Sequence, residues 1–250
     1  MSRIQIPVGL NSSIVERFLN TEGSFAMNKF GENPASAGNA WEDLWDGGGT
    51  YSFPATADIT HLSQAVDQEA MRGKTVHVEG LDINWDLVSQ DVTLDGTLTT
   101  TAVALTTPLT RHNRMHVHAD VVTDQIINLK NVGGGTTYGI IQAGNNQTLQ
   151  AVYSVPRNFT AYMTNFWYDA EQITAARACE FRLWTQDRKN LYAFALKHSR
   201  AVSKEVGSGQ HFFNPYKRIT EKTDIKLNAY PDTNAANTHG GFDLLVIPDS

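Results

Sequence analysis

The chain has 250 residues, of which 41% are hydrophobic and 18% charged, and its formal net charge is -6. This composition is typical of a folded protein with a substantial core and excludes an intrinsically disordered chain. The single Cys179 excludes an internal disulfide, and no apolar run reaches the length of a membrane span.

Residues 1–40 have little regular pattern, and we expect them to form an extended amino-terminal arm. Ile4, Ile6 and Val8 alternate with polar residues as in an edge strand. Ser13 to Asn20 could form a short helix, because its apolar residues share a helical face. Gly31 to Gly38 has the composition of a loop.

From Thr75 onward, short alternating segments separated by turn residues predict one strand after another. Thr75 to Leu81 and Trp85 to Leu94 form the first expected pair, with a turn at Asn84. The later expected strands are 99–105, 109–118, 125–130, 138–143, 149–155, 159–168, 177–185, 191–197, 211–213, 225–229 and 242–247.

This spacing predicts an all-β fold with two successive antiparallel β-sandwich units, Ig-like or jelly-roll-like, after the amino-terminal arm. The first unit would span residues 41–143 and the second residues 144–250, with the division at the Gly144-Asn145-Asn146 turn. A single large jelly roll is the alternative architecture.

Charge is distributed unevenly along the chain. The first 70 residues hold nine acids and three bases, whereas the segment from Arg177 to Lys226 holds eleven bases and five acids. Loops and strand faces could simply differ in charge. Alternatively, an acidic arm could dock on the basic surface of a neighbouring subunit, in which case salt would weaken assembly.

Four stretches carry a family resemblance in their order and rough spacing. They are Trp41 to Pro54, Val78 to Gly96, Ala143 to Pro156 and Ile219 to Leu227. The chain resembles tailed-phage virion structural proteins over about residues 25 to 230. The resemblance implies a place in the virion, on the head, neck or tail, and supplies no catalytic residues.

A glycine run, Gly47 to Gly49, lies among large apolar side chains. These side chains could fill a hydrophobic pocket on a partner, and burial in their own domain is the alternative. The expected partner-binding residues are Trp41, Leu44, Trp45, Tyr51 and Phe53.

Three histidines and an arginine occupy alternate positions from residue 112 to residue 118. Residues two apart on a strand share a face, so we expect His112, Arg114, His116 and His118 to point the same way. Such a face is either simply solvated or an intersubunit contact that responds to pH. A zinc or nickel site with Asp120 is disfavoured, because Arg114 would repel the cation.

No pattern indicates catalysis or a cofactor. Neither Gly47 to Gly49 nor Gly133 to Gly135 precedes a Lys-Ser/Thr pair, so no nucleotide site is expected. Glu42, Asp43 and Asp46 lack the spacing of a calcium loop. We therefore expect no metal, no cofactor, no nucleic-acid or membrane partner, and no enzymatic activity.

The expected function is that of a phage head decoration, or cement, protein. It would bind the major capsid protein across capsomers and also bind itself, with a trimer favoured, after assembly in the host bacterial cytoplasm. The alternative is a receptor- or glycan-binding component of a head or tail fibre, presenting exposed aromatics from the stretch Phe159 to Tyr168. An enzyme hidden in the second unit is a third possibility.

Overall fold

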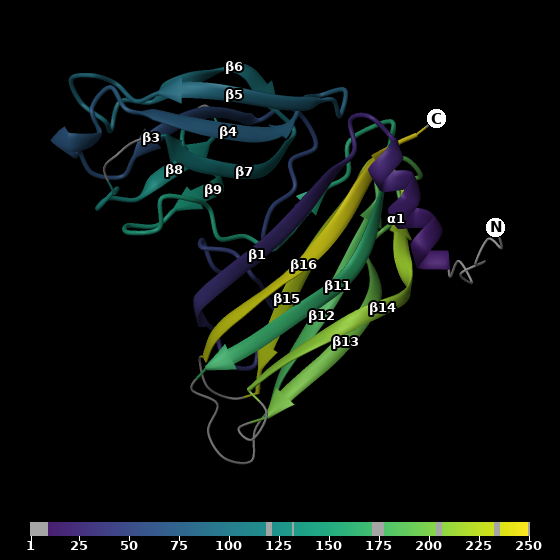
Figure 1. The fold of residues 1–250 in the computed structure, drawn as a ribbon. Helices are drawn as coiled ribbons and strands as arrows, with labels where there is room; N and C mark the ends of the chain where they lie inside the picture. Colours follow the sequence, from purple (N-terminus) through teal and green to yellow (C-terminus); the bar gives the residue numbers. More distant parts are fainter. Residues whose placement is uncertain are drawn as a thin grey trace, which may run out of the picture.

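The computed structural model describes residues 10–118, 122–131, 133–171, 178–203, 207–232 and 236–249. It is 58% strand and 6% helix, and its sheets are antiparallel, so the all-β prediction is confirmed. Figure 1 shows a larger body below and a smaller body above it, which we call the large and the small sandwich.

Two sheets form the large sandwich. The β16 sheet has the order β1-β16-β11-β14, made of β1 (Phe25–Ser36), β16 (Ala236–Pro248), β11 (Phe159–Glu171) and β14 (Ser208–Ile219). The β15 sheet has the order β10-β15-β12-β13, made of β10 (Val152–Ser154), β15 (Thr223–Pro231), β12 (Ala178–Asp187) and β13 (Ala195–Ser203), and β2 (Glu42–Asp43) also pairs with β15.

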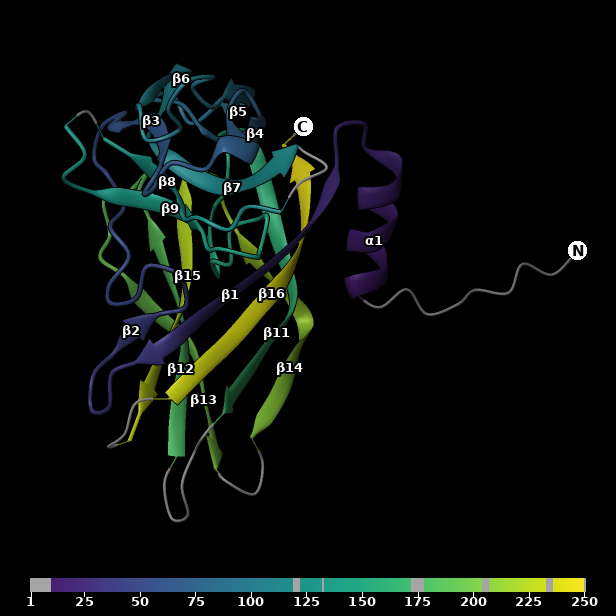
Figure 2. The ribbon, with the colours of Figure 1, turned by 90° about the vertical axis from the view of Figure 1, so that its left-hand side faces the viewer.

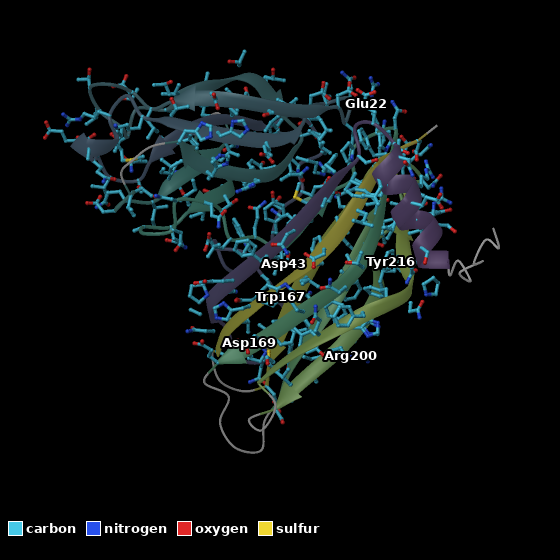
Figure 3. All side chains as sticks on the ribbon, viewed as in Figure 1. Glu22, Asp43, Trp167, Asp169, Arg200 and Tyr216 are labelled. Carbon is cyan, nitrogen blue, oxygen red and sulfur yellow. The ribbon has the colours of Figure 1, made fainter. Side chains whose placement is uncertain are left out.

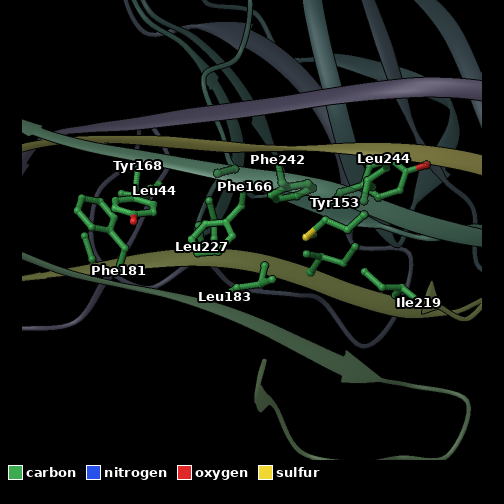
Figure 4. Close-up of a cluster of buried hydrophobic side chains, with 14 of the residues drawn as sticks. Leu44, Tyr153, Phe166, Tyr168, Phe181, Leu183, Ile219, Leu227, Phe242 and Leu244 are labelled. Carbon is green, nitrogen blue, oxygen red and sulfur yellow. The ribbon is translucent and has the colours of Figure 1, made fainter. Parts of the chain in front are cut away.

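The core of the large sandwich lies between these two sheets (Figure 4). Phe166 and Phe242 enter it from the β16 sheet, and Phe181 and Leu227 enter it from the β15 sheet. All four side chains are fully buried. Alternation along each strand therefore places one apolar face inside, as the period of a β-strand requires.

The small sandwich also has two sheets. The β3 sheet has the order β6-β3-β8-β9, made of β6 (Val103–Leu109), β3 (Ile59–Gln64), β8 (Ile127–Lys130) and β9 (Thr137–Ile141). The β4 sheet has the order β5-β4-β7, made of β5 (Leu87–Thr93), β4 (Thr75–Leu81) and β7 (Arg111–His118). A short 3-10 turn at Glu69–Met71 precedes β4, and a separate apolar cluster that includes Met71 fills the space between the sheets.

The small sandwich is inserted into the large one. The chain leaves the large sandwich after β2, forms β3 to β9, and returns with β10. The predicted boundaries 41–143 and 144–250 must therefore be corrected, because β1 and β2 belong to the same sandwich as β10 to β16. Two sandwiches are present, but they do not follow one another along the chain.

The extended arm predicted for residues 1–40 is also corrected for its described part. Helix α1 (Leu10–Asn20) packs on β14 and β16 (Figure 2), and β1 pairs with β16 from Phe25 opposite Val246 to Ser36 opposite Ala236. A Cβ on Gly31 would lie 2.2 Å from two backbone atoms, so glycine permits close packing here. The glycine that suggested a loop is therefore needed for the close packing of strand β1. The expected edge strand at Ile4 to Val8 lies outside the described residues.

Most later strands were predicted from alternation, with some shifts. The expected strand Thr75 to Leu81 coincides with β4. The expected strands 99–105 and 191–197 begin four residues earlier than β6 and β13. Strand β3 was not predicted. No helix in the described ranges has the length and hydropathy needed to cross a bilayer.

A buried ion-pair network joins the two sandwiches. Asp224, at the start of β15, is fully buried, and its carboxylate accepts hydrogen bonds from Arg111 at 2.7 and 3.0 Å. Arg188 and the Ser154 hydroxyl donate to the same carboxylate at 2.7 and 2.6 Å. Arg111 belongs to the small sandwich, whereas Asp224, Arg188 and Ser154 belong to the large one, so this network fixes one sandwich on the other.

Replacing Asp224 by Asn should lower the free energy of unfolding by about 3 to 5 kcal/mol, because two guanidinium groups lose a buried counter-charge. Urea denaturation measures the change. Asp86→Asn is the matched control, since it breaks the exposed Asp86–Arg157 pair and should cost less than about 1 kcal/mol. Equal losses in the two variants would contradict a special role for the buried carboxylate.

Candidate functional site

Three of the five expected partner-binding side chains are buried inside the chain. Leu44 is 0% exposed and lies in the core of the large sandwich, while Trp45 and Tyr51 are 7% and 4% exposed. The prediction that these three bind a partner is therefore corrected. Their alternative, burial in their own chain, holds because the segment after β2 runs through the junction between the sandwiches.

The glycine run has a packing role at this junction. A Cβ on Gly47 would lie 2.2 Å from the Trp45 ring, so the indole folds back over that residue. Gly48 and Gly49 have φ values of +65° and +62°, a conformation that favours glycine. The run therefore lets the chain turn tightly around a buried tryptophan.

Trp41 and Phe53 are half-buried, and their partner-binding role stays a prediction. The Trp41 ring lies 5.1 Å from that of Tyr230, and the Arg182 guanidinium lies 4.0 Å from the centre of the indole. The Phe53 ring lies 5.5 Å from that of Phe194. Both rings are thus held by contacts within the chain and remain partly accessible.

A histidine patch, composed of His77, His116 and His118, occupies the outer face of the β4 sheet. The ring centroids are 4.8 to 5.4 Å apart. His77 lies on β4 directly opposite His116 on β7, and its ring nitrogens lie 2.7 Å from Asp91 Oδ1 and 2.9 Å from Ser89 Oγ. The structure thus brings together two of the predicted histidines and one that the sequence did not single out.

The expectation that His112 shares this face is wrong. Pairing between β4 and β7 shifts where Glu79 lies opposite Arg114 and Gly80 lies opposite His112. This irregularity turns His112 inward, where it is 1% exposed and one ring nitrogen lies 3.2 Å from the Tyr138 carbonyl oxygen. Arg114, in contrast, stays exposed on the outer face.

The surroundings of His116 favour its neutral form. Burial lowers the pKa of His116, and the nearby Arg114 and His77 lower it further, whereas Glu79 raises it. A hydrogen bond to His77 lowers the pKa of Asp91. Protonation of His116 would place a positive charge about 5 Å from the His77 ring and near Arg114, and the pH-sensitive contact expected at this patch stays a prediction.

A groove beside the patch separates the two sandwiches. It has a volume of about 370 Å³ and is lined by Asn28 and Lys29 of β1, Glu79 of β4, Arg114 of β7, and Gln147. The Lys29 ammonium is buried and donates to the Asn113 carbonyl oxygen. Desolvation, together with the charge of Arg114, lowers the pKa of Lys29 to about 7.

Two carboxylates near the glycine run are engaged by groups of the same chain. Asp43 is buried and bound to the Lys226 ammonium at 2.8 Å. Asp46 accepts from the Leu149 backbone N–H at 2.9 Å, and burial raises its pKa to about 7. The Asp43–Lys226 pair also shows that an acid of the first 70 residues meets a carboxy-terminal base within one chain. Asp120, considered above as a zinc ligand, lies outside the described residues.

Comparison with known proteins gives no further guide. No family model matches the chain, and no curated protein matches it. The resemblance to virion structural proteins and the surfaces of the molecule therefore remain as the guides to its function.

Sequence reasoning missed His77 and Lys29. Alternation within Thr75 to Leu81 already placed His77 on a polar face, but only the pairing of β4 with β7 brings it next to His116. Lys29 carries no sequence signal, because its burial results from the insertion of one sandwich into the other.

Lys29→Met should remove part of the pH dependence of stability. The pKa of the Lys29 amine falls from 10.5 to about 7 in the folded chain, so the unfolded chain binds the proton more tightly. At pH values below 10.5, this difference in proton binding lowers the free energy of unfolding. Wild-type stability should therefore rise relative to the variant between about pH 7 and 10.5, by at most about 5 kcal/mol. Urea denaturation across that range measures it, and the exposed Lys197→Met should show no such difference from wild type.

The His116 imidazole should titrate below its ordinary pKa, as followed by the NMR shift of its ring protons. Arg114→Gln should raise the midpoint, because a neighbouring positive charge is lost, and Glu79→Gln should lower it. Shifts of the same sign in both variants would contradict the electrostatic account.

Proposed function

We propose that this protein is a structural component of a phage particle, a head decoration protein that binds the major capsid protein across capsomers. The resemblance of four stretches to virion structural proteins supports the proposal. A rigid body joined by the buried Asp224 network supports it as well, since a reinforcing protein must transmit load between its contacts.

The structural observation that carries the proposal is an exposed edge of the large sandwich. In the described residues, β13 and β14 each pair on one side only, and His198 of β13 stacks 3.9 Å from His211 of β14. We call this surface the β13–β14 edge. Open strand edges are templates for pairing with another chain.

Apolar side chains are also exposed on both strands of this edge. Leu191, Tyr192 and Leu196, at the β12–β13 connection and the start of β13, are 88%, 64% and 46% exposed, and Phe212 of β14 is 66% exposed. Exposed aromatic and aliphatic side chains beside an open strand edge can anchor a partner protein. An interface of about 800 Å² per partner, repeated over a lattice, would reinforce a shell through avidity.

A second candidate, glycan binding, is favoured by a different observation. The Trp167 indole lies over Gly241 on the outer face of the β16 sheet, where a Cβ on that glycine would be 2.8 Å from the ring. Asp169 lies near it on β11 (Figure 3). Asn165 lies two residues before it on the same strand, and Gln210 lies directly opposite it on β14. An aromatic ring bordered by amide and carboxylate groups suits a sugar ring.

Purified protein should sediment with empty phage heads and not with host cells. Leu196→Asp should weaken head binding at least about tenfold, because it places a charge in the β13–β14 edge. Leu87→Asp is the matched control, since Leu87 is similarly exposed on β5, at 49%, and should leave binding unchanged.

Binding to cells or glycans that is lost in Trp167→Ala, without head binding, would favour the second candidate and contradict the first. Equal effects of Leu196→Asp and Leu87→Asp would contradict the assignment of the contact to the β13–β14 edge. Light scattering of the purified protein tests the favoured trimer.

A further inference from the structure

Three potential metal ligands gather on the outer face of the β16 sheet. Asp169 and Glu171 lie two residues apart on β11, and His239 lies on β16 directly opposite Asp169. One ligand atom from each side chain lies within 4.8 Å of the other two. Figure 3 shows Asp169 next to Trp167 near one end of β11. Strand pairing thus sets the spacing of the ligands, since paired residues of adjacent strands hold their Cβ atoms about 5 Å apart.

The two carboxylates lack a counter-charge among the described residues. Within those ranges, neither the Asp169 nor the Glu171 side chain makes a hydrogen bond or an ion pair. A third carboxylate is close, because Glu32 Oε2 of β1 lies 3.8 Å from His239 Nδ1. Carboxylates from the two strands that flank β16 therefore lie near one imidazole, Asp169 and Glu171 from β11 and Glu32 from β1.

The imidazole provides a second, independent observation. The Nε2 atom of His239 is buried, although the side chain as a whole is 28% exposed, and this atom has no hydrogen-bond partner among the described residues. A buried polar atom without a partner is costly, and in native proteins it calls for an explanation such as an ion. The lone pair of a neutral imidazole is a good ligand for transition metals.

We propose that Asp169, Glu171 and His239 bind a divalent metal ion of the zinc class, with Glu32 as a nearby carboxylate that orients the imidazole or joins the ligand set. Metal–ligand bonds of about 2.0 to 2.2 Å place tetrahedral ligand atoms about 3.4 Å apart. The ligand atoms need to close by little more than 1 Å from the observed 4.8 Å limit, and Glu171 is exposed and free to rotate. Calcium fits less well, because it prefers six to eight oxygen ligands.

Three protein ligands leave one coordination position for water or an external ligand. The bound ion would also link β11 to β16, two central strands of the β16 sheet. This site is separate from the β13–β14 edge and does not depend on the proposed function.

Calorimetric titration of the metal-free full chain with Zn²⁺ tests the proposal. Wild type should bind one ion at this site, and Asp169→Asn/Glu171→Gln or His239→Asn should each weaken that binding more than about tenfold. Co²⁺ should give visible absorption bands with wild type that the double variant lacks. Because the three ligands lie at accessible positions, circular dichroism should show that each variant keeps the fold.

The histidine patch provides the control. The double variant His116→Asn/His118→Asn should leave Zn²⁺ binding at Asp169, Glu171 and His239 unchanged. It could at most remove a second, weaker Zn²⁺-binding step. Equal stoichiometry and affinity in wild type and the Asp169→Asn/Glu171→Gln variant would overturn the proposal, as would the absence of Zn²⁺, Mn²⁺ and Co²⁺ binding to wild type at micromolar concentrations.

Discussion

The carboxylate of Asp224, held without contact with water between two guanidinium groups, is the interaction on which the arrangement of the molecule depends. A charge buried in this way is stable only while its partners remain in place, so the small sandwich has one favoured position on the large one. Arg111 begins β7, and two members of the histidine patch, His116 and His118, lie farther along the same strand. The ion pair therefore also sets where the patch and its groove face β1.

Local pattern predicted the fold class and most of the strands. Alternation of apolar and polar residues identified β4 to within a residue and found β5, β7, β11, β12 and β15 within a few residues. It also placed Arg114, His116 and His118 on one face. These successes share a physical basis, because side-chain alternation is a property of a single strand and needs no knowledge of its neighbours.

Features that depend on distant partners could not be predicted. Strand β1 contains glycine, asparagine and proline, and only its pairing with β16 makes it a strand. His112 turned inward because of an irregularity in pairing with β4, which no run of sequence around it reveals. Trp45 and Tyr51 looked like exposed anchors because the sequence does not show that one sandwich is inserted into the other at that point. The metal ligands likewise come from strands about 70 residues apart.

The pairing of β1 with β16 has a consequence for synthesis. These strands lie near opposite ends of the chain, so β1 leaves the ribosome long before its neighbour exists. The small sandwich, in contrast, is encoded by one continuous segment and can collapse around its own apolar cluster as soon as that segment has emerged. The nascent polypeptide must therefore carry β1 without its partner strand until β16 has been made, about 200 residues later in the sequence.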